Sequence, residues 1–247
     1  MKSLLKHSLV VDIGNSNIVL GLCTKNKIQK TWRIPTNVSA IKKWVHSFSK
    51  SQAIERIIVS SVVPTIHASL KKEFKKLNAP THLLTYQDFT ALKLKVKHPS
   101  RVGVDRLVNA IAAHTLYKGD LLIIDIGTAT TFDIVTSQGE FLGGVITPGP
   151  QTINWALFEK CVQLPYLPLK RPPKVIGQET KSAIHSGVYY GYLSLLEGMI
   201  EKIQKEFGAK LKVILTGGPA SLFAPSITKS LHNPQLTLLG LMETRRP

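Results

Sequence analysis

The chain has 247 residues, of which 43% are hydrophobic, and it carries a formal net charge of +17 at pH 7. This length allows one large or two medium domains, and this hydrophobic content supports a buried core, which excludes an intrinsically disordered chain. Apolar runs stay well short of the ~20 residues that span a bilayer, so we expect no membrane association. The two cysteines, Cys23 and Cys161, are too few for a disulfide framework or a metal cluster, which favours a cytoplasmic protein.

The first half of the chain predicts strands followed by helices. Apolar runs predict strands near residues 8–13, 18–23, 28–33 and 56–61. A helix should follow Ser39, because Ile41, Trp44, Val45 and Phe48 share one helical face. We expect a second, Lys-rich helix to begin at Pro64 and a third to run from Asp105 to Tyr117.

The second half predicts the same plan with longer helices. Strands are expected near residues 121–126, 131–136 and 141–146, followed by a proline-rich loop over 147–175 around a short helix at 152–160. A long helix over about 180–206, a strand over 211–216, a glycine turn, a helix and a closing strand near 236–241 complete the chain. Strands that precede and alternate with helices predict α/β domains with mixed sheets.

One short motif occurs twice. Residues 9–14 read Leu-Val-Val-Asp-Ile-Gly, and residues 122–127 read Leu-Ile-Ile-Asp-Ile-Gly, nearly half the chain later. This period is too long for a solenoid repeat, so it predicts two similar domains that face one cleft. We place these domains at residues 1–117 and 118–247.

The motif has a specific chemistry. Its glycine permits a tight turn, and the small polar residues that follow offer N–H and hydroxyl groups that can cradle phosphate. The aspartate repels phosphate but can hold a hydrated Mg²⁺ or a monovalent cation that neutralises it. An ordinary hairpin turn would explain one copy, but turn chemistry gives no reason for two copies in register.

A third acid lies in the run Gly103-Val104-Asp105-Arg106, at the predicted start of a helix. The positive end of the helix dipole favours an ionised carboxylate there. By position alone, a simple N-cap is the favoured interpretation. Beside Arg106, however, Asp105 could also orient a hydroxyl nucleophile, which is what phosphoryl transfer requires.

The positive charge is concentrated in the first half, where residues 1–119 hold 20 Lys and Arg against 5 Asp and Glu. Such an excess could bind nucleic acid or could be a solvated face. Leu70, Phe74 and Leu77 have the spacing of an amphipathic helix, which places the lysines between them on its outer face. Since aromatic residues do not alternate with these lysines, we do not expect nucleic acid as a partner.

Five sequence blocks resemble type III pantothenate kinases, in the family's order and over about residues 9–220. The blocks are Asp12–Asn17, Gly103–Arg106, Asp125–Thr131, Gly143–Gly149, and Ile176–Thr180 followed by Ser186-Gly187. The resemblance implies membership of the superfamily of acetate and sugar kinases, actin and heat-shock chaperones. It implies two ribonuclease H-like (actin-like ATPase) domains, with mixed β-sheets and flanking helices around a central cleft.

The resemblance also implies an activity, which is ATP-dependent phosphorylation of pantothenate at its primary hydroxyl, the first step toward coenzyme A. Asp105 would be the catalytic acceptor of the hydroxyl proton. Asp12 would lie near Mg²⁺, and Asp125 would hold a monovalent cation, K⁺ or NH₄⁺. The residues implied to bind ATP are Asp12, Ile13, Gly14, Asn15, Ser16, Asn17, Ile18, Val19 and Thr128. Those implied to bind pantothenate are Gly103, Val104, Asp105, Arg106 and Thr180.

The family is typically a homodimer, and Gly187, Gly191 and Gly198 on the long helix could be close-packing points between its subunits. This sequence departs from the family at Val96, where a tyrosine that touches the substrate is common. Two other functions stay open. One is an accessory role in transcription, which some family members have been described to have, and the other is a kinase for a different small hydroxyl substrate.

Overall fold

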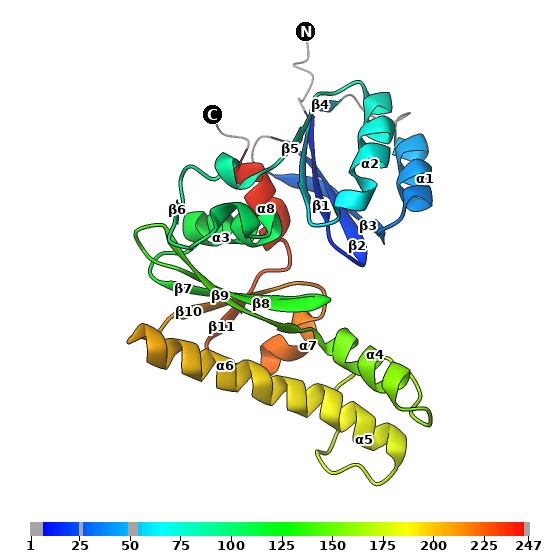
Figure 1. Ribbon diagram of the computed structural model, residues 1–247, viewed down its shortest axis with the longest axis vertical. Helices are drawn as coiled ribbons and strands as arrows, with labels where there is room; N and C mark the ends of the chain where they lie inside the picture. Colours follow the sequence, from blue (N-terminus) through cyan, green and yellow to red (C-terminus); the bar gives the residue numbers. More distant parts are fainter. Residues whose placement is uncertain (1–6, 25–26, 49–53, 245–247) are drawn as a thin grey trace. The chain divides into compact units, whose positions relative to one another are not determined.

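The computed structural model describes residues 7–24, 27–48 and 54–244 (Figure 1). The chain divides into two compact units, one of Met1–Leu116 with Gln235–Pro247 and one of Tyr117–Pro234. Each unit contains a sheet that begins with one copy of the duplicated motif. This division places Tyr117 in the second unit and residues 235–244 in the first, whereas the predicted domains, 1–117 and 118–247, place them the other way round.

The sheet of the first unit has three antiparallel strands followed by two parallel ones. Its order is β3 (Ile28–Pro35), β2 (Asn17–Cys23), β1 (His7–Ile13), β4 (Ile54–Ser61) and β5 (Thr81–Leu83). β2 is antiparallel to both β1 and β3, while β4 runs parallel to β1 and β5 parallel to β4. The four predicted strands are present. β5 was not predicted because its three residues are exposed and form no apolar run; the same unit holds a two-residue strand, β6 (Lys93–Leu94), also not predicted.

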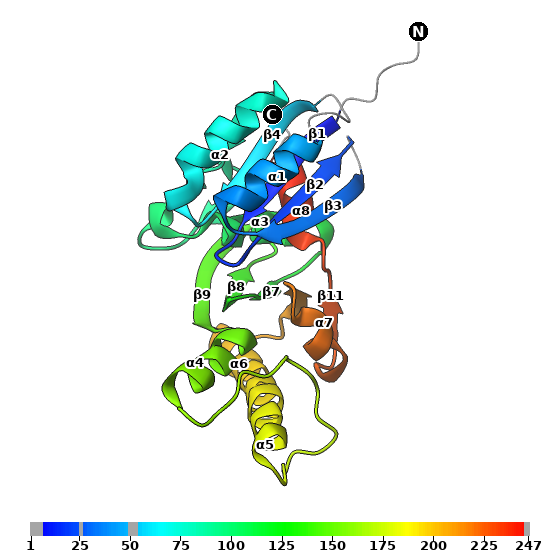
Figure 2. The same cartoon turned by 90° about the vertical axis from the view of Figure 1, so that its right-hand side faces the viewer.

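Two helices cover one face of this sheet. α1 (Val38–Phe48) buries the four predicted residues, Ile41, Trp44, Val45 and Phe48. α2 (His67–Phe74) follows a 3₁₀ turn that begins at Pro64, and Figures 1 and 2 show it beside α1. The rings of Trp44 and Phe48 stack at 4.6 Å between centroids, in one core with Leu70 and Phe74 of α2. The lysines of α2 are exposed, as predicted.

The first unit also contains α3 (Val104–Leu116) and α8 (Leu236–Glu243). The prediction of a closing strand near 236–241 is wrong, because a short apolar run fits a buried helix as well as a strand. A Cβ on Gly240 would lie 2.1 Å from the carbonyl oxygen of Val108, so only glycine allows α8 to pack this closely against α3. Thr237 Oγ1 donates a hydrogen bond of 2.8 Å to Asn109 Oδ1 across the same contact.

The strands of the second unit repeat the order of the first. They follow as β9 (Glu140–Pro148), β8 (Ala129–Val135), β7 (Leu121–Ile126), β10 (Lys212–Thr216) and β11 (Ser230–His232). β8 is antiparallel to its two neighbours, and β10 and β11 are parallel to β7. The repeat predicted from six residues therefore extends over a whole five-stranded arrangement.

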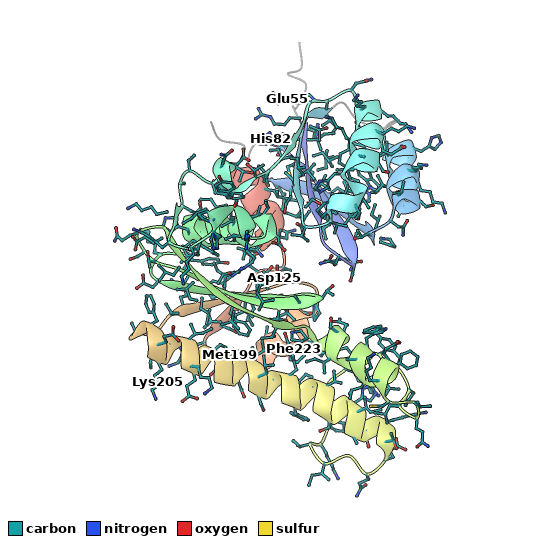
Figure 3. The ribbon with its side chains drawn as sticks, in the orientation of Figure 1. Glu55, His82, Asp125, Met199, Lys205 and Phe223 are labelled. Carbon is teal, nitrogen blue, oxygen red and sulfur yellow. The ribbon has the colours of Figure 1, made fainter. Side chains whose placement is uncertain are left out.

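The helices of the second unit are α4 (Pro150–Lys160), α5 (Thr180–Ser186), α6 (Tyr192–Phe207) and α7 (Ala220–Phe223). The predicted helix over 180–206 is present, but a π-helical turn over Gly187–Gly191 interrupts it. Tyr192 and Leu196 of α6 pack with Leu122 and Ile124 of β7 in one core. Figure 3 shows Phe223 of α7 and Met199 of α6 close to this sheet. No helix among the described residues is both long and apolar enough to cross a bilayer.

Candidate active site

The first copy of the motif forms the turn between β1 and β2. Asp12 is the last residue but one of β1 and is half-buried, and Asn15 and Ser16 are exposed at the tip of the turn. The backbone N–H of Gly14 donates to the carbonyl of Asn17 at 3.0 Å and closes the turn. Thr36, which follows β3, holds the turn from outside, because its hydroxyl donates to the Gly14 carbonyl at 2.7 Å and its N–H to the Ser16 carbonyl at 3.1 Å.

The second copy forms the turn between β7 and β8. The N–H of Gly127 donates to the carbonyl of Ala129 at 3.1 Å, and Thr128 is exposed at the tip. Gly149, which follows β9, donates its N–H to the Thr128 carbonyl at 2.9 Å. A Cβ on Gly149 would lie 1.9 Å from the Gly127 carbonyl oxygen, so the backbone of this turn is in direct contact with the start of α4.

Asp125 occupies the position in β7 that Asp12 occupies in β1, and Figure 3 labels it at this sheet. Thr131 of β8 and Thr216 of β10 lie in register with it on either side. Gly217 has φ +93°, and a Cβ there would lie 2.5 Å from Asp125 Oδ1. The predicted glycine turn therefore lies directly against the carboxylate, a proximity that the sequence did not predict.

Asp105 is the second residue of α3. Gly103 precedes the helix and accepts the first backbone bond from Arg106 at 3.1 Å, so Asp105 is not the N-cap residue. Its Oδ1 accepts the backbone N–H of Arg106 at 2.9 Å. Burial raises the pKa of Asp105 above the ordinary carboxyl value, and this N–H and the Arg106 charge only partly counter the effect. Gly103 makes room for the carboxylate, since a Cβ there would lie 2.5 Å from Oδ1.

The predicted site residues divide between the two units. The first unit contains the segment Asp12–Val19 and the segment Gly103–Arg106. The second contains Asp125 and Thr128 at one turn, and Thr180 as the exposed first residue of α5. Sequence analysis gave no role to Thr131, Thr216 or Gly149, although the blocks Asp125–Thr131 and Gly143–Gly149 contain two of them. Strand register places Thr131 and Thr216 beside Asp125, and contact with the turn identifies Gly149.

A cluster of three or more His, Cys, Asp or Glu side chains able to hold a metal does not occur within residues 7–24, 27–48 and 54–244. Mg²⁺, however, commonly takes one or two carboxylates and keeps several waters. Asp12 at the end of a strand fits that chemistry. Around Asp125, the Thr131 hydroxyl oxygen is buried with no hydrogen-bond partner among the described residues. Asp125 and Thr131 therefore offer oxygen donors that fit a cation.

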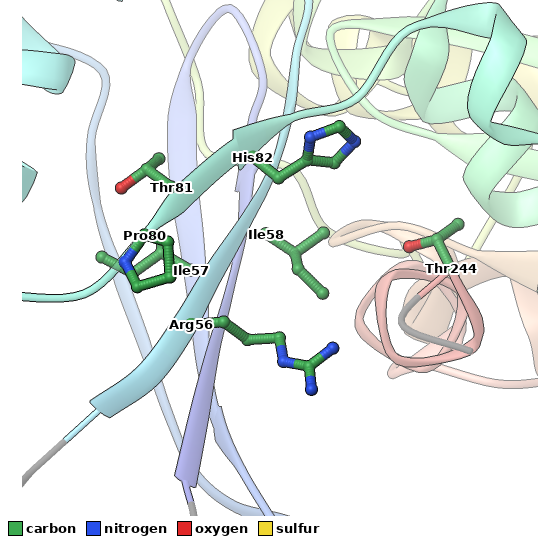
Figure 4. Close-up of a pocket in the computed structure, with 7 residues that line it drawn as sticks. All are labelled: Arg56, Ile57, Ile58, Pro80, Thr81, His82 and Thr244. Carbon is green, nitrogen blue, oxygen red and sulfur yellow. The ribbon is translucent and has the colours of Figure 1, made fainter. Parts of the chain in front are cut away.

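One cavity of about 350 Å³ lies in the first unit, away from these turns (Figure 4). It is lined by Arg56 and Ile58 of β4, His82 of β5 and Thr244 after α8, together with Ile57, Pro80 and Thr81. None of the predicted site residues lines it. His82 Nε2 lies 2.7 Å from Asp88 Oδ1. Burial raises the pKa of Asp88, but hydrogen bonds from the Thr85 backbone N–H and from His82 outweigh it, so the pKa is lowered.

Comparison with solved structures identifies the class of fold. A Campylobacter jejuni protein assigned to the Baf family of transcriptional activators has a TM-score of 0.63 at 21% identity, with 96% of each chain covered. An inorganic polyphosphate/ATP-glucomannokinase from Arthrobacter has a TM-score of 0.51 at 15% identity, covering 97% of this chain and 98% of that one. At these identities the likeness shows the fold alone. It is the α/β fold of the actin-like ATPases, with two ribonuclease H-like domains.

Comparison of sequences identifies the family. Residues 8–202 match the family model described as type III pantothenate kinase. A type III pantothenate kinase of Hyphomonas neptunium is 38% identical, with 95% of this chain and 97% of the relative covered. One of Paramagnetospirillum magneticum is 37% identical, with 96% of both chains covered. The chain belongs to the type III pantothenate kinase family.

Proposed function

We propose that this protein is an ATP-dependent kinase that phosphorylates pantothenate at its primary hydroxyl. The observation that carries the proposal is the acid–glycine turn repeated at the same place in two sheets of the same strand order, in a chain of this family. Phosphoryl transfer depends mainly on positioning and on stabilisation of phosphate charge, and turns of this kind supply both.

The first turn and Thr128 would bind the phosphates of ATP. Exposed backbone N–H groups and the hydroxyls of Ser16 and Thr128 are suitable donors to phosphate oxygens. Asp12 would hold Mg²⁺, and Asp125 with Thr131 would hold K⁺ or NH₄⁺. These cations supply positive charge that neutralises the phosphates when they are bound.

Asp105 would act as the general base. The hydroxyl oxygen of pantothenate attacks the γ-phosphorus of ATP. The bond between the γ-phosphorus and the oxygen that bridges to the β-phosphate breaks, and the hydroxyl proton passes to the Asp105 carboxylate. ADP leaves with the bridging oxygen. Burial favours this role, because a raised pKa makes the Asp105 carboxylate a stronger proton acceptor. Arg106 and Thr180 would bind the substrate.

The pKa of Asp105 sets the pH dependence of the reaction. A general base acts in its ionised form, so activity should persist above the raised pKa and fall as the pH drops through it. We therefore expect the acid limb of kcat/KM to lie above the ordinary carboxyl value of 3.8. The limb should be absent from the residual activity of Asp105→Asn.

The experiment that tests the proposal measures ADP release with ATP, Mg²⁺ and K⁺, with and without pantothenate. We expect turnover that depends on pantothenate and that falls roughly 10²–10⁴-fold in Asp105→Asn while ATP binding is kept. Folded protein that releases no ADP in response to pantothenate would contradict the proposal, and a panel of other small alcohols would then identify the substrate.

The transcriptional alternative is not favoured, because the curated relatives with 34–38% identity are named as kinases. The likeness to the Campylobacter jejuni protein concerns the fold alone. We also propose a cytoplasmic location, since the chain has only two cysteines, Cys23 and Cys161, and they are not joined in a disulfide, as is usual in a reducing compartment.

The proposal includes a homodimer formed through the second unit. Of the eleven large apolar side chains that are exposed among the described residues, eight lie between residues 142 and 176. They are Leu142, Ile146, Trp155, Phe158, Val162, Tyr166, Val175 and Ile176. Gly187 and Gly191 are exposed nearby in sequence. A Cβ added at either would meet no atom within 4 Å other than its chain neighbours and the backbone of its own helix, so another subunit could approach there. Exposed apolar surface of this extent commonly marks an interface.

Light scattering after size exclusion tests the dimer. Trp155→Ser removes an apolar side chain that is 52% exposed, and Leu231→Ser is a matched control outside the segment, at 44% exposed. We expect the first variant to shift toward the monomer and the second to stay dimeric. A wild-type protein that is monomeric at the concentrations used for the assay would contradict the proposal.

A further inference from the structure

Ser60 of β4 is a buried hydroxyl residue without an evident structural role. Its side chain is 0% exposed, and its Oγ has no hydrogen-bond partner among the described residues. A buried hydroxyl without a partner lowers stability compared with a methyl group of similar shape. Most such groups gain their partner from water, an ion or a ligand that joins the site.

The position of Ser60 places its hydroxyl next to the first phosphate-binding turn. In the parallel pairing of β1 and β4, Ser60 is in register with Asp12. Their neighbours Val11 and Val59 lie in the core under α1 and α2, so alternation along each strand directs Asp12 and Ser60 to the opposite face. Adjacent strands lie about 4.8 Å apart, which brings a hydroxyl on one within reach of a carboxylate on the other.

The second unit repeats this arrangement with a different residue. Thr216 of β10 is in register with Asp125 through the same parallel pairing, and it is 1% exposed. A hydroxyl residue therefore lies beside the acid in both sheets, although the residues that follow differ, Ser61 in one and Gly217 in the other. The repeat indicates that the hydroxyl accompanies the carboxylate and does not merely fill space.

We propose that Ser60 is a positioning residue for Asp12, in a role that rests on the proposed function. When the nucleotide and Mg²⁺ are bound, the Ser60 hydroxyl rotates and donates a hydrogen bond to one oxygen of Asp12. That bond fixes the carboxylate so that its other oxygen is turned toward the cation. An ionised carboxylate has about four lone-pair sites, so it can accept this bond and keep its other contacts.

Calorimetric binding of a non-hydrolysable ATP analogue, with Mg²⁺ and with EDTA, tests this role without pantothenate. In Ser60→Ala we expect affinity to fall roughly two- to tenfold with Mg²⁺, as for the loss of one hydrogen bond, and to stay unchanged with EDTA. Ser60→Thr keeps a hydroxyl and should retain the Mg²⁺-dependent affinity. Without ligand, the melting temperature of Ser60→Ala should equal or exceed that of the wild type, because no buried partner is lost.

Ser61 is the matched control, since it is the next residue of the same strand and points to the other face. Its Oγ accepts the N–H of Val63 at 3.2 Å and lies 2.7 Å from His67 Nε2. Ser61→Ala should therefore lower the melting temperature and leave the effect of Mg²⁺ on affinity unchanged.

Two results would overturn the proposal. One is a Mg²⁺-dependent affinity in Ser60→Ala equal to that of the wild type, and the other is a loss of thermal stability in Ser60→Ala as large as in Ser61→Ala. Wild-type protein that binds the analogue with Mg²⁺ but fails to turn over pantothenate would refute the proposed function and leave this role of Ser60 standing. Wild-type protein with no Mg²⁺-dependent binding would refute both.

Discussion

The two units share one strand order, but the contacts that hold their acid–glycine turns come from different elements. In the first unit, a side chain holds the turn, because the Thr36 hydroxyl donates to the Gly14 carbonyl at 2.7 Å. In the second, the hydroxyl comes from Thr152 of α4, which donates to the Thr128 carbonyl at 2.5 Å. Backbone also packs directly against this turn, since a Cβ on Gly149 would lie 1.9 Å from the Gly127 carbonyl oxygen. The sheet therefore fixes the position of the acid, whereas the residues that close the turn differ between the two units.

The third strands show how far the correspondence extends. β3 ends at Pro35, which is in register with the first residue of β2, and β9 ends at Pro148, which is in register with the first residue of β8. Proline ends a strand because it has no N–H for the ladder. In both units the residue after the proline donates its backbone N–H to a carbonyl of the acid–glycine turn. Thr36 donates to Ser16 in the first unit, and Gly149 donates to Thr128 in the second.

The largest expected effect concerns the two acids, which hold equivalent positions and are proposed to bind different cations. We expect Asp12→Asn and Asp125→Asn each to lower kcat/KM by roughly 100-fold or more, beyond the 10–100-fold typical of residues that only support a metal ligand. Titrations should separate them, because Asp12→Asn should raise the Mg²⁺ requirement and Asp125→Asn the K⁺ requirement. Identical Mg²⁺ and K⁺ requirements in the two variants would contradict the proposal that the two acids bind different cations.

The next largest effect concerns the closure of the turns. Gly149→Ala forces a Cβ into backbone atoms that cannot move aside, so we expect a loss of about 3 kcal/mol or more in the free energy of unfolding. Thr36→Val removes one side-chain hydrogen bond, which is worth about 1 kcal/mol. Chemical denaturation measures both. Equal losses would show that the close backbone packing at Gly149 contributes no more than one hydrogen bond.

A buried polar pair distinguishes the units further. Thr130 of β8 bonds to the Tyr192 hydroxyl at 2.5 Å, whereas the equivalent residue of β2 is the apolar Ile18. We expect Thr130→Val to cost about 1–3 kcal/mol, because the Tyr192 hydroxyl is left without this partner. The double variant with Tyr192→Phe should regain most of that loss. A double-mutant cycle measures the coupling, and simple additivity would contradict a direct bond.

The smallest expected effect concerns the first unit alone, at the position where the chain departs from its family. Val96→Tyr restores a hydroxyl that the resemblance implies would touch the substrate. We expect the KM for pantothenate to fall roughly two- to tenfold with kcat nearly unchanged, as for one added hydrogen bond. The KM for ATP serves as the internal control. An unchanged KM for pantothenate would mean that residue 96 does not contact it.

The sequence by itself determined much of the local structure and the family to which the chain belongs. The duplicated motif predicted two acid–glycine turns, and the structure has both between antiparallel strands. The spacing of Ile41, Trp44, Val45 and Phe48 predicted the buried face of α1 correctly. Such features are readable because side-chain periodicity and turn residues act over a few neighbours in the chain. The roles of all the predicted ATP-binding, substrate-binding, catalytic and cation-binding residues stay predictions.

The tertiary structure decided which residues distant in the sequence become neighbours in space. It made Leu236–Glu243 a helix of the first unit, where Gly240 lets α8 approach α3, although the apolar run alone fitted a strand. It also brought Ser60 and Thr216 into register with the two acids and Gly217 against Asp125. These neighbours come from segments about 48 and 91 residues away from the acids in the sequence. Local propensity carries no information on such pairings, because they are fixed by strand register and by packing across the whole unit.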